Sequence, residues 1–175
     1  MAKIRKMYPH ADTPVCLDLM KLIETQSADT LNAWVYEYTV RNYLPVYLKY
    51  AETDAMSAYL ERMKEYTEGK LTPKDYKPVI KQCRESVKGI GNPQEEIAAR
   101  AICTAVSVPS VPASAFGFLL YGAMSTAYEN AGLSQKDETC LKLAEEELAH
   151  ALQDLRAHAK EKKPFLHMSA NLNIM

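Results

Sequence analysis

The residues best suited to chemistry lie near the C-terminal end of the sequence, in Glu147-Leu-Ala-His150. A Glu-x-x-His pair places a carboxylate and an imidazole on one helix face, which is half of the ligand set of di-iron carboxylate bundles. The other half needs a second such pair, and none of the other histidines follows an acidic residue at that spacing. We therefore predict no metal site and no cofactor.

The same segment carries a longer polar row, in which His150, Asp154 and His158 follow one another at four-residue intervals. Side chains at this spacing lie on one helix face, so the row presents two imidazoles and a carboxylate, which are zinc ligands. A solvated helix edge with weak ion pairs explains the spacing equally well, and we expect this arrangement. A helical-bundle metalloenzyme built around Glu147, His150 and His158 is the alternative.

The sequence contains no motif typical of nucleophilic catalysis or of a glycine-rich phosphate loop. The serines at 107, 110, 114 and 125 have no histidine near them in sequence, and no G-x-S-x-G motif occurs. Gly89-Ile-Gly91 follows a predicted helix rather than a strand, so it does not fit a glycine-rich phosphate loop. The residues thus give no positive evidence for a nucleophilic enzyme.

The elements that position these residues are predicted to be helices, because apolar residues recur with a helical period and no alternating strand pattern occurs. Capping residues, several followed by proline, mark the expected helix starts: Thr13-Pro14, Ser27 or Asp29, Asp54, Thr72-Pro73, Asn92-Pro93, Ser110 and Ser134. Pro45 should end or kink the second helix near Leu44. Gly69, Gly89 and Gly132 are the expected helix stops.

We therefore expect an all-α fold, a single-domain bundle of about seven helices over residues 1–175. The last helix is predicted to run to about Lys160, and residues 161–175 to form a C-terminal tail that is loose or docked by Phe165 and Leu166. Solenoid-like stacking of helical hairpins is the alternative architecture.

Residues 101–128 contain no charged residue and are long enough to cross a bilayer. Pro109 and Pro112 interrupt this stretch, and small residues dominate it. Small residues allow helices to approach closely. We therefore expect a central buried pair, one helix ending near Val108 and the next spanning Ser110 to Asn130, and no membrane association.

The sequence has four cysteines, Cys16, Cys83, Cys103 and Cys140, and no two of them are spaced as a C-x-x-C pair. Each lies in a helical stretch with apolar neighbours, where a thiol behaves as a small apolar side chain. We expect all four to be buried and reduced. With no apolar signal segment after the basic N-terminal residues, the predicted location is cytoplasmic.

Aromatic residues are dense between Trp34 and Tyr50. Trp34 and Tyr38 share one helical face and are predicted to pack in the core. Four further tyrosines cannot all share that face: Tyr36, Tyr43, Tyr47 and Tyr50. Core or rim packing is expected for them. The alternative is an interaction face, as in a structural helical adaptor or a homodimer, so the oligomeric state stays open.

Formal net charge is −1 with a pI near 6.4, which argues against a general nucleic-acid binder. Acidic residues concentrate in the last predicted helix, at Asp137, Glu138, Glu145, Glu146 and Glu147. A solvated helix face explains this excess. The alternative is a surface that complements a basic protein partner.

The stretch LNAWVYEYTVRNYLPVYLKY, the following YLERMKEYTEGK and the segment IAARAICTAVSVPSVPASAFGFLLYGAMSTAYE together resemble bacterial immunity proteins of the immunity-protein-five-like family. The shared features are Trp34, Leu44-Pro45, Tyr66 with Gly69, and the Ala-rich pair from Ala98 to Ala127. They cover about residues 15 to 130. The family's small-residue helices often carry histidines where this sequence has Ser110 and Ser114.

The resemblance implies an all-α fold, no enzymatic activity, and a role in neutralising a cognate toxin by binding it. Many toxins that act on nucleic acids are basic. We therefore assign partner binding to the acidic residues Asp137, Glu138, Glu145 and Glu146 of the last predicted helix.

Overall fold

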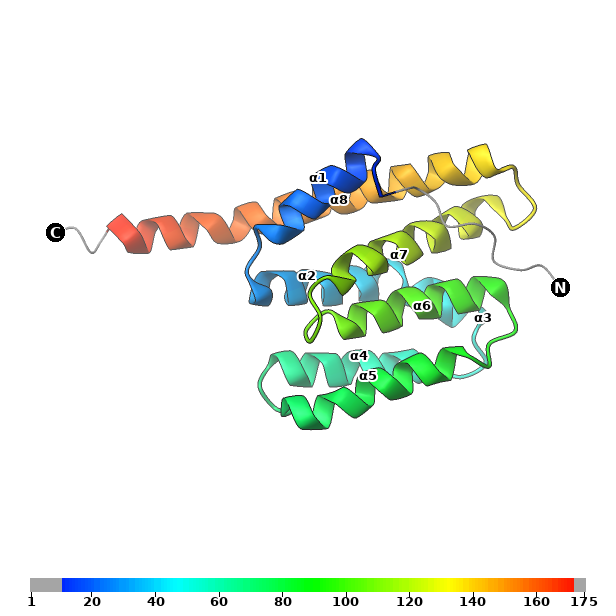
Figure 1. Cartoon of the computed structure of the whole chain (residues 1–175), viewed down its shortest axis with the longest axis horizontal. Helices are drawn as coiled ribbons and strands as arrows, with labels where there is room; N and C mark the ends of the chain where they lie inside the picture. The colour runs from blue at the N-terminus through cyan, green and yellow to red at the C-terminus, as the bar shows by residue number, and fades with distance from the viewer. Residues whose placement is uncertain (1–10, 172–175) are drawn as a thin grey trace.

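The computed structural model describes residues 11–171, and side chains as far as residue 159. Within this range the chain forms eight α-helices and no strand (Figure 1). They are α1 (Pro14–Glu24), α2 (Ala28–Asn42), α3 (Leu44–Tyr50), α4 (Ala55–Thr67), α5 (Pro73–Val87), α6 (Pro93–Ser107), α7 (Ser114–Ala131) and α8 (Asp137–Asn171). The predicted all-α fold is confirmed.

Side-chain caps fix the starts of four helices. Ser27 Oγ accepts a hydrogen bond from the Thr30 amide at 3.1 Å, and Asp54 Oδ1 accepts one from the Ser57 amide at 3.1 Å. The side chains of Thr72 and Asn92 cap α5 and α6 in the same way. These caps satisfy amides that have no partner within the helix, which is why the capping pattern located the starts correctly.

Prolines determine two helix boundaries, the break between α2 and α3 and the start of α7. The second helix ends at Asn42 and the chain breaks at Tyr43, two residues before Pro45 and close to the expected position at Leu44, so α3 is a separate short helix. In contrast, α7 begins at Ser114 rather than Ser110, because Pro112 disfavours helical geometry at the residue before it.

The end of α8 also differs from the expected one. This helix continues past Lys160 to Asn171 and takes in most of the segment expected as a tail, since no glycine stops it. The side chains of Phe165 and Leu166 lie outside the described residues.

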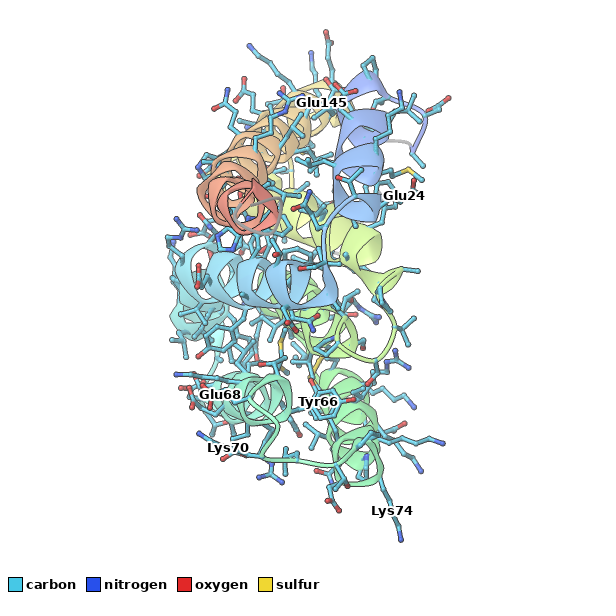
Figure 2. All side chains as sticks on the ribbon, turned by 90° about the vertical axis from the view of Figure 1, so that its left-hand side faces the viewer. Glu24, Tyr66, Glu68, Lys70, Lys74 and Glu145 are labelled. Carbon is cyan, nitrogen blue, oxygen red and sulfur yellow. A yellow bond between two sulfur atoms is a disulfide. The ribbon has the colours of Figure 1, made fainter. Side chains whose placement is uncertain are left out.

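The small-residue helices α6 and α7 form the centre of the molecule. The α6 helix packs against α2, α3, α4, α5 and α7, and α7 packs in turn against α8. Figure 2 shows α1 and α8 at one end of the molecule and α4 and α5 at the other. Because α6 contacts five helices rather than only its sequence neighbours, the architecture is a bundle and the solenoid alternative is wrong.

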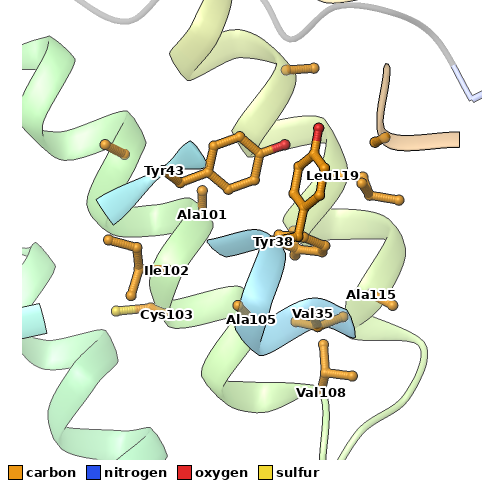
Figure 3. Packing of buried hydrophobic residues seen from close by; sticks show 14 of the residues in the cluster. Val35, Tyr38, Tyr43, Ala101, Ile102, Cys103, Ala105, Val108, Ala115 and Leu119 are labelled. Carbon is orange, nitrogen blue, oxygen red and sulfur yellow. The ribbon is translucent and has the colours of Figure 1, made fainter. Parts of the chain in front are cut away.

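Residues 101–128, the uncharged stretch, supply much of this core. Ala101, Ala105 and Ala115 are fully buried and let the α6 and α7 backbones approach each other (Figure 3). Among the described residues, the structure has no helix with the length and apolarity needed to cross a membrane.

The expectation that all cysteines are reduced is wrong for Cys83 and Cys103, which form a disulfide. Their Cα atoms are 5.7 Å apart, within the range that a disulfide requires. The bond joins α5 to α6, and sequence spacing alone gave no sign that packing brings the two residues together. Cys16 and Cys140 are buried and do not take part in this disulfide.

Reduction of this disulfide should lower the free energy of unfolding. A cross-link between residues 20 positions apart restricts the unfolded chain, and the expected loss on reduction is about 3 kcal/mol. Urea unfolding with and without the reductant TCEP measures it. The variant C83A/C103A is the control and should not respond to TCEP. An equal TCEP effect on both proteins, or none on the native chain, would contradict the assignment.

Candidate functional site

The carboxylate of Glu147 is the most buried acidic group in the described part of the chain, with 9% of the residue exposed. Two tyrosine hydroxyls donate to the same oxygen of this side chain. Tyr38 Oη lies 2.6 Å from Glu147 Oε1, and Tyr43 Oη lies 3.0 Å from it. Figure 3 shows the two tyrosines side by side among the core residues. A buried carboxylate needs such partners, because burial without hydrogen bonds costs several kcal/mol.

His150 extends this network toward the solvent. Its Nδ1 lies 2.9 Å from the Tyr38 hydroxyl oxygen and 3.7 Å from Glu147 Oε2. Tyr38 has one proton, which it donates to Glu147, so the His150 Nδ1–H group must donate to Tyr38. The result is a chain of hydrogen bonds from a half-exposed imidazole to a buried carboxylate.

One turn further along α8, Asp154 is held by two α2 side chains. Trp34 Nε1 donates to Asp154 Oδ1 at 2.8 Å, and Arg41 bridges both carboxylate oxygens at 3.2 and 3.3 Å. We call the whole set the α2–α8 seam. It consists of Trp34, Tyr38, Arg41 and Tyr43 on the α2 side, and of Glu147, His150 and Asp154 on α8.

Tyr43 reaches Glu147 only because α7 has a glycine at the crossing point. A Cβ atom placed on Gly122 would overlap the ring and hydroxyl of Tyr43. The backbone of α7 therefore lies directly against the ring. The break between α2 and α3 at Tyr43 and the missing side chain at Gly122 together admit this tyrosine to the core.

The electrostatics of the seam follow from its burial. Desolvation raises the pKa of Glu147, while the hydrogen bonds from Tyr38 and Tyr43 and the nearby His150 act in the opposite direction. Burial also raises the pKa of both tyrosines, and the Glu147 carboxylate raises it further. Both hydroxyls therefore stay protonated and serve as donors.

The predicted row of His150, Asp154 and His158 is a solvated helix edge only at His150, because the side chains of Asp154 and His158 are mostly buried. Glu147 and Asp154 face α2 and are held there, while His158 lies beyond them, with its Nδ1 3.9 Å from Glu37 Oε2. The three residues of the metalloenzyme alternative do not converge on one point. Among the described residues, no group of three or more metal-ligating side chains could hold an ion.

The dense tyrosines serve mainly internal contacts, as the core interpretation expected. Tyr43 and Tyr47 are buried, although their spacing relative to Trp34 argued against a shared face. The helix break resolves this, because α3 runs in a new direction after Tyr43. Tyr36 and Tyr50 are half-buried and donate to Glu61 and Glu129.

Sequence reasoning missed Tyr38 and Tyr43 as partners of Glu147, and Gly122 as the position that makes room for the Tyr43 ring. A signal for the burial of Glu147 was present, because it shares a helix face with Ala144 and Ala151, which are both fully buried. The tyrosine partners left no such signal, since residues more than a hundred positions away in sequence meet Glu147 only in the folded chain.

The four residues assigned to partner binding lie in the first turns of α8. Asp137, Glu138 and Glu146 are exposed, whereas Glu145 is half-buried. Burial raises the pKa of the Cys16 thiol of α1, and the charges of Glu145 and Asp12 raise it further. Glu145 therefore lies beside α1, and Asp12 joins the acidic residues on this side of the molecule. Figure 2 shows Glu145 at the α1–α8 end.

A family model described as Imm-5 like putative immunity protein matches residues 21–155. The matched range contains all of α2 to α7 and every residue of the α2–α8 seam. It confirms the resemblance seen in the sequence and extends further into α8 than the quoted motifs did. No curated protein and no solved structure gives a match.

The close contact at Gly122 leads to a stability prediction. G122A should lower the free energy of unfolding by about 2 kcal/mol or more, because the new methyl group displaces the Tyr43 ring. Urea unfolding measures this loss of stability. In a Y43L background G122A should cost less, because the ring that the added methyl group meets is gone.

G117A is the matched control on the same helix, where an added Cβ meets only Thr104 Cγ2 at 3.3 Å. Its effect should stay below about 1 kcal/mol, since alanine also favours the helix. Equal effects of G122A and G117A would contradict the proposed packing.

Proposed function

The chain belongs to the Imm-5 like putative immunity protein family, and we propose that it is an immunity protein that binds a cognate bacterial toxin and neutralises it without catalysis. The observation that carries this proposal is the family match, which spans most of the helical bundle. Binding would block the active site of the toxin or the path of its substrate. The proposed place of action is the cytoplasm.

The polar residues of the α2–α8 seam stabilise the bundle, which supports a binding role. Glu147, Asp154 and the tyrosine hydroxyls of the seam are engaged in hydrogen bonds between helices, which stabilise the bundle. A preorganised surface loses little conformational entropy on association, so a rigid bundle suits tight protein binding.

We propose that the toxin contacts the acidic residues at the start of α8, Asp137, Glu138, Glu145 and Glu146. Three of the four are exposed, and in the described residues none of the four belongs to an ion pair. Their charges are therefore available to a basic partner. Charges of this kind accelerate association with an oppositely charged surface and act most strongly at low ionic strength.

The variant D137N/E138Q/E145Q/E146Q should bind the toxin more slowly at low salt, by roughly tenfold in the association rate constant. The toxin is the protein recovered by co-purification or encoded beside the gene of this chain. Stopped-flow or biosensor kinetics measure the rate with the disulfide-bonded chain. The difference should shrink near 0.5 M salt, where the screening length falls to about 4 Å.

The control variant E24Q/D29N/E52Q/E61Q also removes four negative charges, all of them exposed and outside the assigned set, and should associate at nearly the native rate. Equal slowing of both variants would show a general effect of net charge and would contradict the assigned surface. Failure of the native chain to bind or inhibit any such toxin would contradict the function itself.

A further inference from the structure

A groove of about 350 Å³ lies between α5, α6 and α7, away from the seam and from the acidic start of α8. Three cationic side chains line it, Arg84 and Lys88 from α5 and Arg100 from α6. Three hydroxyl side chains complete its polar lining, Thr104, Ser107 and Tyr121. The volume is at the lower end of the range for small-molecule sites.

No carboxylate lines this groove. Glu96 accepts from Arg100 along α6, and Glu85 accepts from Lys88 along α5, but neither belongs to the lining. Arg84 donates instead to Ser107 Oγ at 3.1 Å, and in the described residues it has no acidic partner. Arg84 is thus the cation of the lining that no carboxylate compensates in the described residues, and an anion in the groove would compensate it.

The hydrogen-bond donors of the groove can be assigned from the contacts of its hydroxyls. Thr104 donates to the Arg100 carbonyl at 2.6 Å, and Ser107 donates to the Cys103 carbonyl at 3.0 Å, so the protons of both hydroxyls are already used. Within the described part of the chain, the Tyr121 hydroxyl has no recorded partner. Arg100 donates through Nε and Nη2 to Glu96, and Lys88 donates to Glu85. The donors left to the groove are therefore the Arg84 guanidinium, the remaining N–H groups of Arg100 and Lys88, and the Tyr121 hydroxyl.

The face of α5 that leads to the groove is also basic. Lys74, Lys77, Lys81, Arg84 and Lys88 recur at intervals of three and four residues, which aligns them on one side of the helix. All five are exposed. Such a row raises the local concentration of anions and directs them along the helix toward the groove.

The Cys83–Cys103 disulfide fixes the distance between the two helices that carry the arginines. Cys83 directly precedes Arg84, and Cys103 follows Arg100 by one helical turn and itself lines the groove. The two guanidinium groups thus come from backbones that are covalently joined beside the groove, which limits the reorganisation that binding requires.

We propose that this groove is a binding site for a phosphate group, in which Arg84 and Arg100 contact the phosphate oxygens. The planar guanidinium matches the geometry of phosphate oxygens and forms short, charge-assisted hydrogen bonds with them. Lys88 adds charge, and Tyr121 adds a neutral donor. The site is independent of toxin binding and uses none of the residues assigned to it.

Isothermal titration calorimetry at fixed ionic strength, with the full oxidised chain, tests the proposal with two phosphate probes. One probe is inorganic phosphate and the other is O-phosphoserine. Saturable binding of one equivalent of either probe is expected at millimolar concentration. Binding of inorganic phosphate supports a free-phosphate site, whereas binding of O-phosphoserine alone supports a site for phosphate esters.

R84Q/R100Q should weaken the binding by roughly tenfold or more, since it removes both guanidinium groups. R62Q/R156Q is the matched control, because it removes two exposed arginines outside the groove, one of them in an ion pair along its helix like Arg100. R84K/R100K keeps the charge and shows whether the planar geometry is needed. Circular dichroism confirms that each variant is folded.

Three results would overturn the proposal. The first is no saturable binding of either probe, and the second is equal weakening in the groove variant and the control variant. The third is binding of acetate as tight as that of phosphate, since it would show a site for any small anion.

Discussion

The structure depends on one buried negative charge. Glu147 is a carboxylate inside an otherwise apolar core, and it stays there because Tyr38 and Tyr43 donate to it and His150 supports Tyr38 from the solvent side. Removal of either hydroxyl would leave the charge with too few partners, which costs more than an ordinary surface hydrogen bond contributes. Several features of the fold serve this one contact. The chain breaks between α2 and α3 so that Tyr43 turns inward, and α7 has a glycine where the ring crosses it.

The same contact connects the fold to the proposed function. It holds the middle of α8 against α2, and α8 carries at its start the acidic residues assigned to the toxin. Glu147 and Asp154, two of the potential ligand residues of α8, hold α8 against α2. Exposed acidic residues lie at the α1–α8 end, and a basic row lies on α5 at the opposite end (Figure 2). The two proposed binding surfaces share no residue and lie on different helices.

Local patterns in the sequence predicted the helices well, because caps such as Ser27, Asp54 and Asn92 act within one turn of the chain. The central position of α6 and α7 followed from their small, uncharged residues. Contacts between distant residues were not predicted. The Cys83–Cys103 disulfide, the tyrosine partners of Glu147 and the role of Gly122 all depend on how helices pack, and helical periodicity does not specify that. The groove beside α5 was missed for the same reason, since its arginines belong to different helices.

The importance of the buried carboxylate is tested most directly by a double-mutant cycle between Tyr43 and Glu147, with free energies of unfolding from urea titrations. Y43F alone should cost about 1.5 to 3 kcal/mol, as expected for a hydrogen bond to a charged group. In an E147M background the same change should cost at least 1 kcal/mol less, because the acceptor is gone. Y50F, whose hydroxyl contacts Glu129, should show no such coupling to E147M. Additivity of Y43F and E147M within about 0.5 kcal/mol would contradict the central role of Glu147.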